Sequence, residues 1–329
     1  MIPLSKTELF EPARSCWVCG NAGLRHCASL VMDLSIYRDQ DPELAEYRDL
    51  RLDLLECPAC GFAQPEALPT LPRFFDRMYD QQWSPDWIAN EFTSCSKDLI
   101  FGTVLDSLEH RSPGREGRLL DVGAHVGRLL HLATARGWQG EGIELNPRTR
   151  AYAETATGLP VHGRNARELA DAGSRYRAIT LIDVLEHIPE PVGLLKTLFA
   201  LLEPGGVLVV KILNGRAQRW KERAKARTRA GYRPSLADNL VHVNHFGPQS
   251  LRLALEAAGF EDVEIQQGAP EEVPPVGGLR GTLRNRIRPA FLVYYLLEAQ
   301  PSRLAAPLYL HLQACARRPE DQRRARSVS

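Results

Sequence analysis

The stretch Leu119-Leu-Asp-Val-Gly-Ala-His-Val-Gly-Arg-Leu-Leu130 decides the fold. Its apolar start leads into a turn with glycines at positions 123 and 127, and an amphipathic segment follows as far as Arg136. This pattern is typical of a short buried strand that passes through a tight turn into a helix. In parallel α/β sheets, ligands bind beside such turns, at the carboxyl ends of the strands.

Strands and helices continue to alternate after this stretch. We expect strands at Gly140–Glu144, Ala178–Leu185 and Val207–Leu213, and helices from Pro147, at Val192–Leu202 and at Pro248–Ala258. The segment from Tyr309 to Ala316 alternates in polarity and is expected to return as a last, antiparallel strand. The alternation predicts a mostly parallel sheet covered by helices on both faces.

The first turn carries side chains suited to adenosine. Gly123 and Gly127 let the backbone approach a ligand, and Glu144, at the end of the second expected strand, can accept both ribose hydroxyls. The Gly-x-x-x-Gly spacing differs from the G-x-G-x-x-G of dinucleotide sites. Asp121 would repel a pyrophosphate, but it suits a ligand that carries a cationic amino acid.

Five motifs between residues 118 and 266 resemble class I S-adenosylmethionine-dependent methyltransferases. They are Leu119 to Leu130, Gly142-Ile-Glu-Leu-Asn146, Ile182-Asp-Val-Leu-Glu-His-Ile-Pro-Glu-Pro191, Leu202-Glu-Pro-Gly-Gly-Val-Leu-Val-Val210, and His242-Val-Asn-His-Phe-Gly-Pro-Gln-Ser-Leu251 with Ala258-Gly-Phe260. The resemblance implies an α/β, Rossmann-like fold with a seven-stranded sheet in the order 3-2-1-4-5-7-6. It also implies S-adenosyl-L-methionine as cofactor.

The resemblance assigns roles to individual residues of the expected cofactor site. Asp121, Gly123 and Gly127 would hold the methionine end, Glu144 and Leu145 the ribose end, and Asp183 would close the pocket. Asn165 falls where an acid or amide binds the adenine, although a helix N-cap explains it equally well. His125 departs from the family, which usually has glycine there, so the turn is either reshaped or weakened as a cofactor site.

Two CxxC pairs, Cys16/Cys19 and Cys57/Cys60, are each followed by glycine. Two such turns can supply four thiolates to one ion, which closes a tetrahedral coordination sphere and leaves no place for substrate. The spacing therefore predicts a structural Zn²⁺ site. Free thiols or a redox pair are the alternatives, and His26 or Cys27 could replace one ligand. The double knuckle resembles the zinc module of sugar C-methyltransferases, although this chain lacks their extra C-terminal domain.

Three histidines are candidates for a catalytic base. His187 follows the fourth strand, and His242 and His245 lie in the lid before the helix at Pro248–Ala258. In the sugar C-methyltransferases a Glu-His pair and a tyrosine occupy this lid. Here Val241 replaces the glutamate and His245 replaces the tyrosine, which favours O-methylation over C-methylation.

The segment from Arg216 to Arg233 carries eight basic residues against Glu222 alone. Because it follows the fifth strand, we expect it to project over the substrate mouth. It is either a solvated helix or a receiver of an anionic small-molecule or carrier-linked acceptor, and a helix lying on a membrane surface is a further alternative. No nucleic-acid partner is expected, since aromatic side chains for base stacking are few there.

The chain has 329 residues, a net charge of +1 and a pI of about 7.7. No signal peptide or transmembrane stretch is apparent, so we expect a soluble, cytoplasmic protein, with a homodimer as one option. The expected organisation is a zinc module (1–70), a helical connector (71–117), a methyltransferase domain (118–317) and a disordered tail (318–329). Lid insertions are expected at about 214–246 and 270–304.

These observations predict methyl transfer from S-adenosylmethionine to an oxygen of a sugar or natural-product intermediate. C-methylation of a keto-sugar nucleotide is the alternative within enzymes. A non-catalytic zinc-knuckle binding protein with a degenerate methyltransferase fold is the alternative outside them.

Overall fold

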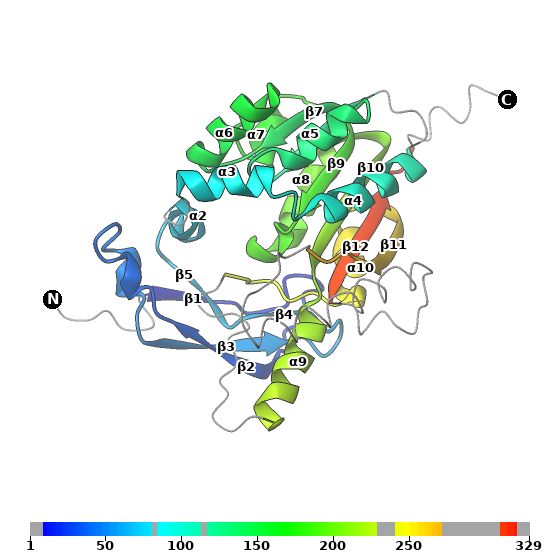
Figure 1. Cartoon of the computed structure of the whole chain (residues 1–329). Helices are drawn as coiled ribbons and strands as arrows, with labels where there is room; N and C mark the ends of the chain where they lie inside the picture. The colour runs from blue at the N-terminus through cyan, green and yellow to red at the C-terminus, as the bar shows by residue number, and fades with distance from the viewer. Residues whose placement is uncertain (1–8, 81–83, 113–116, 229–240, 272–309, 321–329) are drawn as a thin grey trace.

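A seven-stranded sheet lies at the centre of the molecule, in the order β8-β7-β6-β9-β10-β12-β11 (Figure 1). The computed structural model describes residues 9–80, 84–112, 117–228, 241–271 and 310–320. Its strands are β6 (Arg118–Val122), β7 (Gln139–Ile143), β8 (Val161–His162), β9 (Tyr176–Ile182), β10 (Leu202–Leu213), β11 (Glu261–Gln267) and β12 (His311–Arg317). Only β12 runs antiparallel to its neighbours. Counted from β6, this is the predicted order 3-2-1-4-5-7-6.

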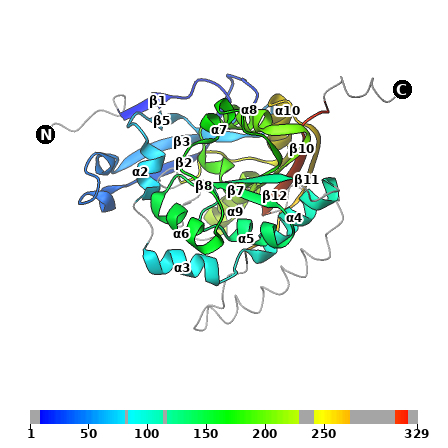
Figure 2. The same ribbon diagram turned by 90° about the horizontal axis from the view of Figure 1, so that it is seen from above.

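Helices cover both faces of this sheet, as the view from above shows (Figure 2). They are α4 (Asp98–Arg111), α5 (Arg128–Ala135) and α6 (Pro147–Thr157) on one face, and α7 (Ala166–Asp171), α8 (Pro191–Leu201) and α10 (Pro248–Ala257) on the other. Neighbouring strand residues face opposite sides, so Leu119 packs with α4 and α5, whereas Leu120 packs with α8 and α10. Burial of both faces explains the continuous apolar runs of the strands.

The N-terminal residues form two small sheets. Strands β2 (Arg25–Met32), β3 (Leu50–Glu56) and β4 (Ala63–Pro65) make an antiparallel sheet, and β1 (Phe10–Pro12) pairs with β5 (Ala67–Pro69). The antiparallel pair β2–β3 lies between the two CxxC turns. Its inward residues, such as Leu30, Leu52 and Leu54, form a core with Tyr47.

The connector between the small sheets and the large one is more broken than predicted. It holds three separate helices, α2 (Phe74–Asp80), α3 (Pro85–Thr93) and α4, within the helical connector expected at 71–117. The chain turns between α3 and α4 at Cys95, which has a positive φ of 54°. Arg128 of α5 holds this break by pairing with Asp98 at 2.5 Å and contacting the Cys95 sulfur at 3.2 Å.

The small sheets pack on the lid segment that precedes α10. Ala63 forms a β-bridge with His245, and the Phe62 ring lies 4.8 Å from that of Phe246. Residues 229–240, which include the end of the basic segment, lie outside the described residues, as do most of the second expected lid and the tail from residue 321. Within the described ranges, no helix combines the length and apolar composition needed to cross a bilayer.

Candidate active site

A cavity of about 790 Å³ lies at the carboxyl ends of β6, β7 and β9. Helices α2, α3 and α4 border it on the other side with Asp76, Trp87, Lys97 and Phe101. Its size is in the usual range for a small-molecule or cofactor site. The connector is therefore part of the wall of this cavity.

Asp121 lies at the end of β6, with only 4% of its surface exposed. Its Oδ1 accepts a hydrogen bond from the Thr180 hydroxyl at 2.7 Å. Burial raises the pKa of Asp121 to about 7, helped by the charge of Glu144 and opposed by the bond from Thr180. A cation placed in the cavity would favour the ionised form of this carboxyl.

Glu144 follows β7, and two backbone N–H groups orient its carboxylate. Oε2 accepts from His125 N and Oε1 from Asn146 N, both at 2.8 Å. Burial raises the pKa of Glu144. Each oxygen keeps further acceptor capacity for ligand hydroxyls. Leu145 beside it lines the cavity with half its surface exposed, so a flat apolar ligand there would gain contact area.

Contacts within the protein also require the two glycines of the first turn. Both have a φ of 80°. A Cβ on Gly123 would lie 2.4 Å from a methyl group of Val184, and one on Gly127 would lie 3.1 Å from Cβ of Ala153. Their missing side chains thus make room for protein neighbours. Gly123 lines the cavity, whereas Gly127 is the N-cap of α5 and is not among the lining residues.

His125 occupies the turn position where glycine was expected, and its φ is 51°. Its ring packs edge-on against Trp87 of α3 at 5.3 Å. Burial lowers the pKa of His125 to about 4, so the ring is neutral at neutral pH. The turn keeps its left-handed conformation and gains a contact to the connector.

Asn165 and Asp183 both line the cavity. Asn165 is the N-cap of α7 in a capping box: its side chain accepts from Glu168 N at 3.0 Å. The N-cap reading is therefore correct, and a contact of its amide to a ligand remains open. Asp183 accepts from Lys211 Nζ at 2.6 Å. Burial opposes its ionisation, but the Lys211 charge outweighs this and lowers the pKa of Asp183.

His187 and His242 lie next to each other. His187 lines the cavity together with Val241. Their ring centroids are 4.8 Å apart, and Nδ1 of His187 lies 2.5 Å from the Val241 carbonyl oxygen. Burial lowers the pKa of His187, and it lowers that of His242 to about 4 with help from the charge of His187.

Glu186 was missed as a site residue, although it precedes His187 in a motif read from the sequence. It is buried, and its carboxylate and the two imidazoles offer ligand atoms within 4.8 Å of one another. Burial and the charge of Asp183 raise the pKa of Glu186 to about 8. Its position behind the cavity comes from the three-dimensional packing of the lid, which a strand motif does not reveal.

His245 does not lie at the cavity, contrary to its prediction as a base. It is buried against the small sheets, where its backbone pairs with Ala63. Burial lowers the pKa of His245 to about 3. The β-bridge to Ala63 thus places His245 among the N-terminal residues, and His245 is not among the residues that line the cavity.

The basic segment forms α9 (Gly215–Thr228), and none of its residues is among those lining the cavity. The expectation that it projects over the substrate mouth is wrong for this helix, because α9 packs along β3 and β2 (Figure 1). Arg219 is buried and donates to Glu56 at 3.1 Å and to the carbonyls of Gly61 and His245. This residue joins α9 to the small sheets.

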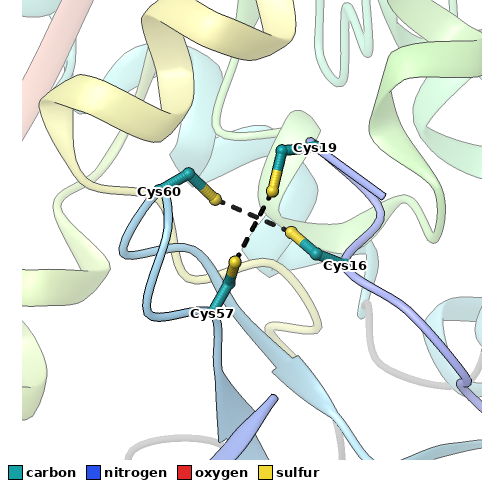
Figure 3. Close-up of side chains that lie close together, drawn as sticks. All are labelled: Cys16, Cys19, Cys57 and Cys60. Carbon is teal, nitrogen blue, oxygen red and sulfur yellow. Dashed lines mark hydrogen bonds between the residues drawn. The ribbon is translucent and has the colours of Figure 1, made fainter. Parts of the chain in front are cut away.

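The four predicted cysteines converge from the two CxxC turns (Figure 3). Sγ of Cys16 lies 3.6 Å from that of Cys60, and Sγ of Cys19 lies 3.5 Å from that of Cys57. Four thiolates at about 2.3 Å from one Zn²⁺ ion would stand roughly 3.8 Å apart. The donor set and its spacing therefore fit a tetrahedral thiolate site.

The two turns share one geometry. The glycines after them, Gly20 and Gly61, have φ values of 73° and 72° and donate to the carbonyls of Cys16 and Cys57. A hydrogen bond from Cys60 lowers the pKa of Cys16 to about 5 against the effect of burial, which favours a thiolate.

Comparison with known proteins agrees with the fold. A model of the family described as a methyltransferase domain matches residues 99–265, about half of the chain. A ubiquinone biosynthesis O-methyltransferase of Cereibacter sphaeroides is 36% identical over 153 residues, covering 43% of this chain and 62% of that protein. One of Idiomarina loihiensis is 27% identical over 199 residues, covering 58% and 79%. The chain thus spans about three fifths of the length of the first relative.

A solved S-adenosylmethionine-dependent methyltransferase from Archaeoglobus fulgidus aligns with 71% of this chain and all of its own, at 17% identity and a TM-score of 0.46. A likeness at that level says nothing about substrate. The methyltransferase class predicted from the motifs is confirmed by the domain match: this chain belongs to the methyltransferase domain family.

Proposed function

We propose that this protein transfers the methyl group of S-adenosylmethionine to a hydroxyl oxygen of a small-molecule or carrier-linked acceptor. The observation that carries the proposal is one cavity in which Asp121 and Glu144 end neighbouring parallel strands. The similar proteins named O-methyltransferases support oxygen as the methylated atom. A sugar or natural-product hydroxyl stays the acceptor class that we favour.

We assign the residues of the cavity to two groups, one that binds the cofactor and one that binds the acceptor. Asp121 would take the ammonium of the methionine moiety, the Glu144 carboxylate the ribose hydroxyls, and Leu145 one face of the adenine. Asp183 and Lys211 form an ion pair beside this group. When bound, the cofactor supplies a methyl group on a sulfonium, which is already activated toward nucleophiles.

The acceptor would lie toward His187 and Val241, which line the far end of the cavity. Because its pKa is lowered, His187 is uncharged at neutral pH and able to accept a proton from an acceptor hydroxyl. His242 stacks against His187 from outside the lining and would position it. Holding the acceptor oxygen in line with the methyl group lowers the activation barrier by about 7–11 kcal/mol, which is more than proton acceptance by His187 contributes.

We also propose that Cys16, Cys19, Cys57 and Cys60 hold a structural Zn²⁺ ion. The spacing of their sulfur atoms supports it. Because all four positions of a tetrahedron would be filled by sulfur, the ion would take no part in the reaction.

The test of the cofactor site is calorimetric titration of the full chain with S-adenosylhomocysteine. Glu144→Ala removes the acceptor for two hydroxyls and should weaken binding at least about tenfold. Glu154→Ala is the matched control. Glu154 is an exposed glutamate in α6, the helix that follows Glu144, and its variant should bind S-adenosylhomocysteine as the parent does. Full-affinity binding by Glu144→Ala would sink the assignment.

The chemistry is tested with radiolabelled S-adenosylmethionine and a panel of hydroxylated acceptors. Label recovered as a methyl ether supports the proposal, and label on carbon would favour C-methylation of a keto-sugar. A protein that binds no S-adenosylhomocysteine would support the non-catalytic alternative.

A further inference from the structure

Helix α9 presents a row of mostly basic side chains to solvent. Arg216, Trp220, Arg223 and Arg227 are all exposed and recur at spacings of four, three and four residues, so they lie along one side of the helix. Lys221 is exposed beside this row, and 67% of the surface of Trp220 is exposed. We call these five residues the α9 face.

The opposite side of α9 is fixed to the rest of the protein. Ala217, Arg219 and Glu222 are buried there, and Arg219 donates to Glu56 of β3 at 3.1 Å. The helix is therefore held in place by its inner side. Its outer side is left as a rigid surface, which lowers the cost of ordering it when a partner binds.

Most of the charge on the α9 face is not neutralised within the protein. Arg216, Lys221 and Arg227 form no ion pair with another described residue, and Arg223 meets Glu56 only at 3.7 Å with 54% of its side chain exposed. The helix holds six basic residues and one acidic residue, whereas the whole chain carries only +1. The positive charge is thus a local patch that can attract an anionic partner.

The α9 face lies beside the cavity and not in it. None of its residues lines the cavity, but α9 begins two residues after β10, whose Lys211 pairs with the lining residue Asp183 at 2.6 Å. Five residues of chain span at most about 18 Å, so Arg216 lies within that distance of Lys211. Its N–H donates to the Phe246 carbonyl at 3.3 Å, in the lid segment that begins with the lining residue Val241. A partner on α9 would therefore stand next to the acceptor end.

The composition of α9 separates three classes of anionic partner. Trp220 is the sole large apolar residue of the helix, whereas a helix that lies in a membrane surface needs a continuous apolar side. Single-stranded nucleic acids require several aromatic side chains for base stacking, and α9 offers one. An acidic protein surface requires neither, and Trp and Arg are the residues that contribute most to the centres of protein–protein interfaces.

We propose that the α9 face docks an acidic protein that carries the methyl acceptor, so that the acceptor is carrier-linked. Carboxylates of the partner pair with Arg216, Arg223 and Arg227, and Trp220 packs against its surface. Docking beside the cavity raises the effective concentration of the attached acceptor there. The carrier role rests on the proposed function, whereas the binding of an acidic protein does not.

Docking is tested with a fluorescein-labelled oligoglutamate, whose fluorescence anisotropy is followed as the purified full chain is added. We expect binding that weakens as salt is raised, because exposed charges are screened. The double variant Arg216→Glu/Arg227→Glu should weaken binding at least about tenfold, and Trp220→Ala at least about fivefold. These positions are exposed, so the buried side of α9 stays unchanged.

A second double variant, Arg167→Glu/Arg175→Glu, is the matched control. It changes the net charge by the same amount, but at exposed positions in and just after α7, which lies at the opposite end of the molecule from α9 (Figure 1). This control should bind oligoglutamate as the parent does. Equal weakening in the two double variants, or none in either, would show that the affinity does not come from the α9 face.

Vesicles of phosphatidylglycerol and phosphatidylcholine, and polyuridylate, are the probes for the other two partner classes. If the parent protein bound either of them and did not bind oligoglutamate, α9 would be a membrane or RNA contact and the proposal would be wrong.

The carrier role is tested in the radiolabel assay, with each acceptor offered free and coupled to oligoglutamate through a flexible linker. Coupling should lower the KM of the methylated acceptor at least about tenfold, and Arg216→Glu/Arg227→Glu should remove that gain. An unchanged KM on coupling would reject the carrier role.

Titration with S-adenosylhomocysteine keeps this proposal apart from the methyltransferase one. A protein that binds S-adenosylhomocysteine but not oligoglutamate overturns the docking and leaves methyl transfer standing. Oligoglutamate binding that depends on the α9 face, in a protein that binds no S-adenosylhomocysteine, supports the docking and overturns the proposed function.

Discussion

At the scale of single residues, Asp121 makes the pH dependence of cofactor binding predictable. Its pKa is raised to about 7 by burial, so much of it is protonated and neutral below that pH. A cationic ligand group binds the ionised form better. The affinity for S-adenosylhomocysteine should therefore rise with pH through about 7 and level off above it. It should be about tenfold weaker at pH 6 than at the plateau.

Calorimetric titrations between pH 5.5 and 7.5 measure this slope. Asp121→Asn cannot ionise, so its binding should be weak and nearly independent of pH over that range. A parent protein whose affinity does not change with pH would show that Asp121 does not meet a charged group of the ligand.

Two substitutions at His125 separate the free-energy cost of its left-handed backbone from the stabilising contact of its ring with Trp87. His125→Ala and His125→Gly both lose the contact to Trp87, but only alanine keeps a Cβ at a φ of 51°. We expect the glycine variant to be more stable than the alanine variant by about 1 kcal/mol in urea unfolding. Equal stabilities would mean that the turn relaxes when the ring is removed.

The sequence located most of the proposed cofactor residues but not the packing contacts that some of them make. Asp121, Gly123, His125, Glu144 and Leu145 all line the cavity, because strand-to-helix turns are encoded locally. The reason for the glycines was not accessible, since Val184 and Ala153, which fill their missing side-chain space, are distant in the chain. For the same reason, the sequence pointed to position 241 for an acidic partner of His242, whereas in the structure the carboxylate near His242 is that of Glu186.

At the scale of elements, local patterns predicted five of the seven strands of the large sheet, including the antiparallel β12, but not β8 or β11. They did not predict the break between α3 and α4, where no glycine or proline marks the turn and a contact from Arg128 holds it. The charge pattern of α9 indicated a solvated or anion-binding helix. Charge alone does not reveal that one arginine of the helix is buried.

Arg219 should therefore contribute to stability and not to acceptor binding. Arg219→Met keeps the apolar stem but removes the bonds to Glu56 and to the carbonyls of Gly61 and His245. The His245 carbonyl then keeps only its bond from Ala63 N, and Glu56 only its ion pair with Arg223 at 3.7 Å. We expect a loss of about 3 kcal/mol in the free energy of unfolding, measured by denaturant titration. Arg227→Met, an exposed position on the same helix, should change it by less than about 0.5 kcal/mol.

The KM for a methyl acceptor, measured once such an acceptor is identified, tests whether Arg219 also contributes to acceptor binding. If the KM rises many-fold in Arg219→Met while stability is unchanged, the arginine binds substrate and our placement of α9 is wrong.

At the scale of the whole molecule, the cysteine cluster and the large sheet share one core. Cys16, Cys57, Cys60 and Phe62 pack in the same apolar cluster as Phe246 and Leu251, which precede and form α10. The CxxC spacing predicted the cluster itself. It could not predict this docking, because the contacts join residues that lie nearly two hundred positions apart. A shared core predicts that the N-terminal residues and the large sheet unfold together.

Replacing Cys57, one of the four proposed zinc ligands, tests this coupling. Because structural zinc sites contribute folding free energy directly, Cys57→Ser should lower the free energy of unfolding by more than about 4 kcal/mol. Cofactor binding should then be lost at the same, lower denaturant concentration as secondary structure, in a single transition. Cys27→Ser, a half-buried cysteine outside the cluster, should shift that transition little. Two separate transitions, with S-adenosylhomocysteine binding unaffected by the first, would instead mean that the cysteine cluster stabilises only the N-terminal sheets.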